Sequence, residues 1–318
     1  NLTLTNYTFS ATKPSIGTVR SPQSTTRYKL VGPNAALFSL SKENQLAIRP
    51  RALKQAQPWY DIVLQGQSSA GQVRDTVRVV NDQFIRNKVI AHRGAWKQTK
   101  TTENSLAALN NAIRLGCMGS EFDVHMSADS VLFINHDPTI QGIAIEKTTA
   151  SELLKVKLEN GETLPTLTAY LTEGMKQNRT RLILEIKTST QGKERSMALT
   201  ERVVKLVHKL RAQAWVDYIA FDYDVCKKVQ ALDPVARVAY LLGDKSPTLL
   251  AEDKLFGFDY HFSIVKKNEP WIRDAQQRQL TVNVWTVNDR ETMEWMLARN
   301  VDFITTNEPE LLLELVKK

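Results

Sequence analysis

The pattern of apolar and polar positions changes about a quarter of the way along the chain. In residues 1–84, short runs alternate apolar and polar side chains, as at Tyr60, Ile62 and Leu64, and helical periodicity is absent. Alternation with a period of two is typical of half-buried β-strands. Turn-forming segments such as residues 67–71 separate the runs. The pattern therefore predicts a small all-β sandwich domain over residues 1–84.

From residue 85 onward, short apolar runs alternate with longer amphipathic stretches. The runs expected to form strands are residues 89–91, 119–124, 182–186, 218–221, 237–241, 260–263, 281–285 and 302–304. Eight strands separated by helical stretches predict a parallel sheet that closes into a (β/α)8 TIM barrel over residues 85–318. The alternative, an open doubly wound sheet, requires a Gly-rich phosphate loop after its first strand. The sequence contains neither GxGxxG nor GxxxxGK, which favours the α/β barrel.

Charged side chains follow several of these predicted strands. The residues at the strand ends are His92 and Arg93, Glu121 and Asp123, Glu185 and Lys187, and Trp285. In a barrel of this kind the C-terminal ends of the strands converge on one site. Residues two apart in a strand point to the same face, so we expect Glu121 and Asp123 to point together.

Three of these side chains are carboxylates, and burying them together without compensation would be costly. Oxygen ligands with no cysteine among them favour Mg²⁺ or Ca²⁺. The alternative is a buried ion network in which Arg93 and Lys187 pair with the acids. The same two cations could instead hold a phosphate group. A metal ion and both cations would then neutralise a phosphoryl group as charge develops on it.

The chain has five histidines, and two are candidates for catalysis. His92 ends the first predicted strand, and His136 follows an apolar run. Two histidines at one site could divide the roles of general base and general acid, although a single histidine is more often structural. His125 is expected either to support the acidic site or to lie at the surface. His208 is expected to face solvent, and His261 is a candidate for lining the pocket.

An ordered series of short motifs runs along most of the chain. The motifs are Ala91-His92-Arg93-Gly94, Glu103-Asn104-Ser105, the pair Glu121 and Asp123, His136-Asp137, Gly161-Glu162 with Pro165 and Leu167, Leu184-Glu185-Ile186-Lys187, and Trp285-Thr286-Val287-Asn288. Through this series, residues from about 89 to 313 resemble the glycerophosphodiester phosphodiesterase family. The resemblance implies metal-dependent hydrolysis of a small-molecule glycerophosphodiester to an alcohol and sn-glycerol 3-phosphate. The attacking oxygen would belong to water or to a substrate hydroxyl.

The same resemblance implies a role for each site residue. It implies one divalent cation, Mg²⁺ or Ca²⁺, on Glu121, Asp123 and Glu185, an acid/base pair of His92 and His136, phosphate contacts from Arg93 and Lys187, and an aromatic pocket wall at Trp285. Residues from about 138 to 164 correspond to the family's insertion after the second strand. That insertion is expected to cap the site and shape its glycerol end.

The N-terminal region carries a second resemblance. Residues 28–80 resemble a cadherin-like domain through the runs at residues 28–32, 36–40, 46–48 and 60–64. The acidic calcium-binding clusters of true cadherins are missing from the sequence. We therefore expect this domain to be a spacer or a docking module whose partner the sequence does not identify.

Composition limits the other classes of protein. The formal net charge of +8 suits an anionic partner, but no basic run interleaved with aromatics occurs, which disfavours nucleic acid. No apolar stretch of about 18 residues is present, so no transmembrane segment is expected. Two distant cysteines, Cys117 and Cys226, exclude a disulfide framework and a cysteine-ligated zinc site. The N-terminal β domain and a first residue other than Met predict export to the periplasm, the cell surface or the medium.

Two other functions are compatible with these features. A phosphoinositide- or sphingomyelin-type phospholipid phosphodiesterase on the same barrel would need an exposed apolar surface near the pocket mouth, for which Trp96 and Trp271 are candidates. A non-catalytic protein could instead bind its partner through the β domain, because a fold does not by itself determine function.

Overall fold

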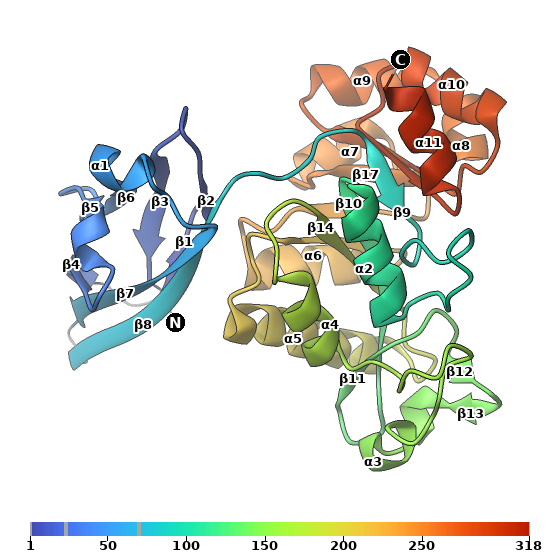
Figure 1. The fold of residues 1–318 in the computed structure, drawn as a ribbon, viewed down its shortest axis with the longest axis horizontal. Helices are drawn as coiled ribbons and strands as arrows, with labels where there is room; N and C mark the ends of the chain where they lie inside the picture. The colour runs from blue at the N-terminus through green and yellow to red at the C-terminus, as the bar shows by residue number, and fades with distance from the viewer. Residues whose placement is uncertain (1, 22–24, 69–70, 318) are drawn as a thin grey trace. The chain divides into compact units, whose positions relative to one another are not determined.

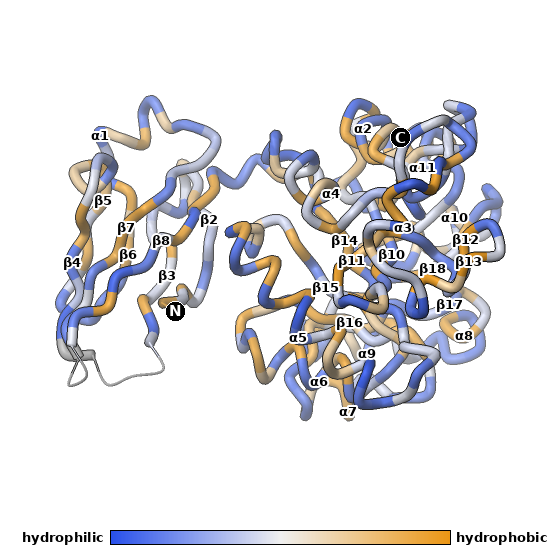
Figure 2. Tube along the Cα trace, turned by 90° about the horizontal axis from the view of Figure 1, so that it is seen from below, coloured by the Kyte–Doolittle hydropathy of each residue, from blue (hydrophilic) through white to orange (hydrophobic). Residues whose placement is uncertain are grey.

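The structure, a computed structural model, describes residues 2–21, 25–68 and 71–317. The chain divides into two compact units. The first comprises Asn1–Phe84 and the short segment Arg211–Trp215, and the second comprises Ile85–Leu210 and Val216–Lys318. Figure 2 shows apolar stretches along the strands of both units and hydrophilic stretches in many of the connecting segments.

The N-terminal unit contains two four-stranded sheets. One has the order β1 (Thr3–Leu4), β3 (Ser15–Arg20), β6 (Gln45–Ile48) and β5 (Phe38–Leu40), and the other has the order β2 (Thr8–Phe9), β8 (Gly71–Asn81), β7 (Trp59–Ser68) and β4 (Thr25–Val31). The sheets meet through apolar side chains: the rings of Phe38 on β5 and Tyr60 on β7 pack edge to face, with centroids 5.3 Å apart. Two helical turns, η1 (Ala35–Leu37) and α1 (Pro50–Leu53), lie between strands. The all-β prediction for this region is confirmed.

Eight parallel strands close the barrel of the second unit. Their order is β9 (Val89–Ala91), β10 (Gly119–Met126), β14 (Arg181–Ile186), β15 (Val216–Ala220), β16 (Val238–Tyr240), β17 (Gly257–His261), β18 (Thr281–Trp285) and β19 (Phe303–Thr306), and β19 pairs with β9. Ile90, Ile183 and Ile219 belong to the apolar cluster that fills the barrel interior. The predicted (β/α)8 barrel is confirmed, and its filled interior leaves the C-terminal ends of the strands as the place for a site.

Helices surround the barrel (Figure 1). They are α2 (Leu106–Leu115), α4 (Leu167–Gly174), α5 (Lys193–Leu210), α6 (Tyr223–Leu232), α7 (Pro247–Glu252), α8 (Phe262–Lys267), α9 (Pro270–Gln277), α10 (Arg290–Ala298) and α11 (Pro309–Val316). Ser105, Thr166 and Asp289 each accept a hydrogen bond from the backbone N–H three residues later and so cap α2, α4 and α10. No helix formed by the described residues is both long and apolar enough to span a membrane.

The sixth barrel strand begins earlier than the sequence predicts. The predicted run at residues 260–263 covers only its end, because the strand is Gly257–His261 and Phe262 already opens α8. Asp259, which is buried in the barrel, breaks the apolar pattern of the first half of the strand. The strand ends where the His261 ring accepts a hydrogen bond from the N–H of Ser263 at 3.3 Å, the arrangement of a helix N-cap.

An excursion of the chain lies between β10 and α4. It contains β11 (Leu132–Ile134), which pairs antiparallel with β10, the hairpin β12 (Thr139–Ile140) and β13 (Ile143–Ala144), η2 (Ile145–Lys147) and α3 (Ala150–Leu153). A separate apolar cluster holds it together, made of Phe133, Ile145, Leu153, Val156, Leu158 and Leu164. The Glu162 carboxylate accepts hydrogen bonds from the N–H groups of Leu106 and Ala107 at 2.9 and 3.0 Å. The excursion is thereby attached to the N-terminus of α2, where a negative charge is favourable.

Candidate active site

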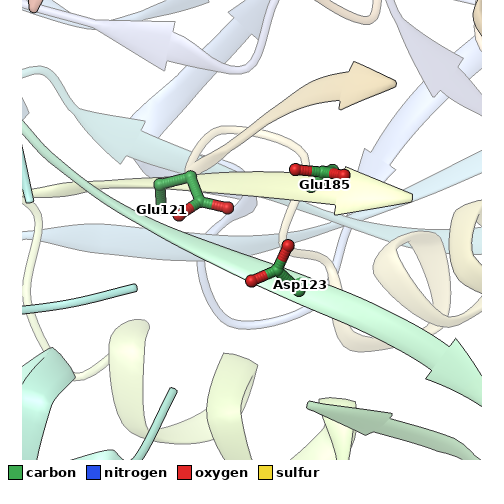
Figure 3. Close-up of side chains that lie close together, drawn as sticks. All are labelled: Glu121, Asp123 and Glu185. Carbon is green, nitrogen blue, oxygen red and sulfur yellow. The ribbon is translucent and has the colours of Figure 1, made fainter. Parts of the chain in front are cut away.

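Three carboxylates meet at the C-terminal ends of two neighbouring barrel strands. Glu121 and Asp123 lie on β10 and Glu185 on β14, where Asp123 and Glu185 are register partners. One oxygen from each lies within 4.8 Å of the others, and Figure 3 shows the three side chains converging. Their side chains are almost completely buried. The expectation that Glu121 and Asp123 point together agrees with this arrangement.

The three acids cannot all ionise easily in this position. Burial and the nearby Asp123 carboxylate raise the pKa values of Glu121 and Glu185. Burial also opposes ionisation of Asp123, but Lys187 and Asn104 contribute to holding its pKa below the usual range. Glu121 Oε1 is buried and accepts no hydrogen bond from the described residues. A set of buried oxygen donors with an unsatisfied atom and excess negative charge fits a hard divalent cation.

His92 follows β9. Strands β9 and β14 flank β10 on its two sides, so His92 and Glu185 approach the acids of β10 from opposite sides. Its Nδ1 lies 2.7 Å from Asn307 Oδ1, and its Nε2 lies 3.9 Å from Glu121 Oε2. Burial, together with the charge of Arg93, lowers the pKa of His92 to about 4. The ring is therefore neutral at physiological pH.

Arg93 sits in a sharp turn immediately after β9. Its backbone is left-handed, with φ of 58°, and Gly94 follows with φ of 82°. A Cβ at Gly94 would come within 2.6 Å of Ala108, so this turn requires glycine. The turn points the Arg93 N–H at Glu121 Oε2, 2.9 Å away, and places the guanidinium 2.9 Å from Glu103.

His136 lies on the excursion after β11. Its Nδ1 is 2.7 Å from Asp137 Oδ1, and its charge affects the pKa values of both Asp123 and His92. The buried His125 on β10 holds this segment, because its Nε2 lies 3.1 Å from the His136 carbonyl oxygen. The expectation that His125 lies at the surface is therefore wrong.

Lys187 follows β14, the strand of Glu185, and Trp285 ends β18. The Lys187 ammonium is 2.8 Å from Glu185 Oε1 and 3.3 Å from Asp123 Oδ1. Burial disfavours its charge, but these two carboxylates raise the pKa of Lys187 above the usual value. Trp285 ends β18, and its ring packs edge to face against those of Phe221 and His261, with centroids 5.5 and 5.2 Å away. His261 and Trp285 end the neighbouring strands β17 and β18, whereas Phe221 follows β15, which pairs with β14 of Glu185.

Two polar residues that contact the candidate site were not assigned from the sequence. Asn104 donates a hydrogen bond from Nδ2 to Asp123 Oδ2 at 2.9 Å, and Asn307 contacts His92. Asn104 belongs to the Glu103-Asn104-Ser105 motif, so the sequence did contain a signal for it. Asn307 follows the last strand and belongs to none of the motifs. The expectation for His208 was wrong: its side chain is only 16% exposed, and its Nε2 lies 2.8 Å from the buried Asp233.

A cavity of about 450 Å³ opens near the candidate site, and the three carboxylates are not among its lining residues. Its walls come from the loop after β9 and from the excursion, and they include Trp96, Glu103, Asn104, Asp137 and Gln141. Asn104 contacts Asp123 and Asp137 contacts His136, so the cavity adjoins the groups that carry charge. A small polar molecule fits a space of this size.

Comparison with known proteins agrees with the geometry. Residues 92–311 match the model of the glycerophosphoryl diester phosphodiesterase family. The chain is 27% identical over 252 residues to a glycerophosphodiester phosphodiesterase of Caldanaerobacter subterraneus subsp. tengcongensis, covering 74% of this chain and 99% of that one.

Solved structures are also similar. A crystal structure of a glycerophosphodiester phosphodiesterase from Parabacteroides distasonis is 41% identical, with a TM-score of 0.71, and covers 72% of this chain and 96% of that one. An Oleispira antarctica phosphodiesterase, solved in complex with the product sn-glycerol-3-phosphate, is 22% identical with a TM-score of 0.60 and covers 73% and 97% of the two chains. At that identity the second similarity concerns the fold alone.

Proposed function

Because the chain belongs to the glycerophosphoryl diester phosphodiesterase family, we propose that it hydrolyses glycerophosphodiesters to an alcohol and sn-glycerol 3-phosphate, using one divalent cation and two histidines. Family membership makes it an enzyme, a glycerophosphodiester phosphodiesterase. The observation that carries the detailed proposal is the buried set of Glu121, Asp123 and Glu185 with oxygens within 4.8 Å of one another. These three residues would hold Mg²⁺ or Ca²⁺, which when bound neutralises charge on a phosphate oxygen.

His92 is the better candidate for the general base. An amide oxygen only accepts hydrogen bonds, so the proton of the neutral His92 ring lies on Nδ1, facing Asn307 Oδ1 at 2.7 Å. The Nε2 lone pair is then free on the side of the acids, where Glu121 lies. A neutral ring with its lone pair toward the reacting centre can take a proton from the attacking oxygen.

His136 is the better candidate for the general acid. Its partner is a carboxylate, Asp137, which accepts the Nδ1 proton and compensates the positive charge of a doubly protonated ring. Such a ring can donate the proton on Nε2 to the departing alkoxide. The different partners of the two histidines, an amide and a carboxylate, support opposite roles in one reaction.

Arg93 and Lys187 are suited to hold the phosphate. Both lie against the carboxylates, with the Arg93 Nε 3.9 Å from Asp123 Oδ2 and the Lys187 ammonium closer still. Guanidinium and ammonium groups bind phosphate oxygens through charge-assisted hydrogen bonds. Trp285, at the end of β18, would form part of the pocket wall that contacts the substrate.

The test is release of glycerol 3-phosphate from glycerophosphocholine and glycerophosphoethanolamine, with and without a chelator. We expect metal-dependent product that falls about 10³-fold in His92→Ala and in His136→Ala, a loss within the range for removing a general acid or base. Circular dichroism establishes that each variant is folded. Near-normal rates from a folded double variant would rule out the histidine roles. If folded, metal-loaded protein releases no product from these compounds but cleaves phospholipid vesicles, the substrate assignment is wrong.

A further inference from the structure

The positive charge of the chain is concentrated in the N-terminal unit. Residues 1–84 contain ten Lys and Arg but four Asp and Glu, a formal charge of +6 out of the total of +8. The rest of the chain is nearly balanced. The carboxylates and histidines of the active site all lie in the other unit, so the proposed hydrolysis does not explain why the small β domain is so basic.

Three of these ten cations lie close together on one face of one sheet. In β4, β7 and β8, the apolar side chains of Tyr28, Ile62, Leu64 and Val77 are buried against the core. The alternate residues point outward. Two neighbouring rows cross the three strands there: Lys29, Gln65 and Arg74 are register partners in one, and Arg27, Gln67 and Gln72 in the next. We call these six residues the cation–amide face.

The cations of this face have no acidic partner in the described part of the chain. Among the described residues, no carboxylate forms an ion pair with Arg27, Lys29 or Arg74, and all three are exposed. The same side of the sheet shows the opposite arrangement further along the strands. There Asp61 binds Arg78 through two hydrogen bonds of 2.8 Å and Arg211 at 2.9 Å. Charge is therefore neutralised at one end of the sheet and left available at the other.

The chemistry of the face indicates its ligand. Guanidinium and ammonium groups bind carboxylates, and glutamine amides can both donate to and accept from hydroxyl groups. Neighbouring strands lie about 4.8 Å apart, so each row spans roughly 10 Å. The two rows together place three cations beside glutamine amides. A polymer that carries carboxylates among many hydroxyls matches such a flat, repeated surface.

Two other anionic partners fit less well. Binding to a lipid surface is aided by exposed apolar side chains, but the large hydrophobics exposed in the described part of the chain are Val131, Leu154, Leu232, Leu242 and Leu249, all outside this unit. Single-stranded nucleic acid is held by aromatic stacking as well as by charge, and the face contains no aromatic residue. We propose that the cation–amide face binds an acidic polysaccharide and keeps the enzyme attached to it.

The experiment uses the full chain and polygalacturonate as the probe, with affinity measured by retardation in gels that contain the polymer. The face variant is Arg27→Gln with Lys29→Gln and Arg74→Gln. The matched control is Lys13→Gln with Lys42→Gln and Lys54→Gln, which removes the same charge from exposed positions elsewhere in the same unit. Neutral dextran, duplex DNA and vesicles of anionic lipid serve as alternative ligands.

We expect salt-sensitive binding to polygalacturonate that weakens about tenfold or more in the face variant, since three exposed ion pairs act together. The control variant should bind nearly as well as the wild type. Equal weakening in both variants would overturn the proposal, because net charge alone would then explain binding. Tighter binding to DNA or to vesicles than to polygalacturonate would also overturn it and would identify that ligand as the partner. Absence of binding to polygalacturonate would also overturn it. Glycerophosphocholine hydrolysis should be the same in all three proteins, which separates this result from the proposed activity.

Discussion

Buried carboxylates lie at both ends of the barrel, and their surroundings differ. Near the start of β15, Asp217 contacts two guanidinium groups, those of Arg181 and Arg237. At the C-terminal strand ends, three carboxylates share two cations, and Glu121 Oε1 is left without a hydrogen bond from the described residues. The ion pairs that the sequence allowed between the acids and Arg93 or Lys187 do form, at Asp123 and Glu185. An excess of buried negative charge is what distinguishes a metal site from a structural ion pair.

The largest effect is expected from removing one charge of the triad. Glu185→Gln should lower turnover of glycerophosphocholine by about 10³-fold, because the proposed cation loses a ligand and the phosphate loses its neutralising charge. Stability without metal should not fall, since burial and Asp123 raise the pKa of Glu185 and the charge is unfavourable there. Turnover and thermal unfolding, each measured with and without Mg²⁺ or Ca²⁺, would test the loss of activity and the unchanged stability. Glu194→Gln, an exposed position on α5, is the control; full activity in Glu185→Gln would contradict the metal assignment.

The opposite result is expected at the other end of the barrel. Asp217→Asn should lower the free energy of unfolding by about 2 kcal/mol, because the buried guanidinium-to-carboxylate hydrogen bond from Arg237 would lose its charged acceptor. Its turnover per folded molecule should be unchanged. Urea unfolding and active-site kinetics on the same preparation test the contrast. A variant that is as stable as the wild type but inactive would remove the distinction between the two ends.

The smallest effect concerns pH. Burial lowers the pKa of His92 to about 4, so the base should stay active well below neutral pH. In Asn307→Asp, a carboxylate beside Nδ1 favours the protonated ring and should raise that pKa by about 1 to 2 units. The acidic limb of kcat/KM should then move to higher pH by the same amount, with rates above pH 8 little changed.

The control for this shift is Asn300→Asp, which makes the same charge change at an exposed position of the barrel unit. It should leave the pH profile where it is. An acidic limb that does not move in Asn307→Asp would indicate that a group other than His92 determines it.

The periodic pattern of the chain predicted the barrel because its strands are short apolar runs between amphipathic helices. The pattern placed the start of β17 too late, because the buried Asp259 interrupts the apolar run there. In the N-terminal unit the alternation predicted strands correctly. The cadherin-like resemblance of that unit and the export of the chain stay predictions, since both depend on homology and targeting rather than on hydrophobic pattern.

The sequence by itself determined which side chains share a face, because strand geometry fixes the direction of residues two apart, as at Glu121 and Asp123. Only the tertiary structure decided which strands are neighbours. Glu185 joins the other two acids because β14 pairs with β10 across the intervening excursion and α4. Asn307 reaches His92, 215 positions away, because barrel closure pairs the last strand with the first. Such contacts depend on non-local pairing, which one local pattern of apolar and polar residues does not encode.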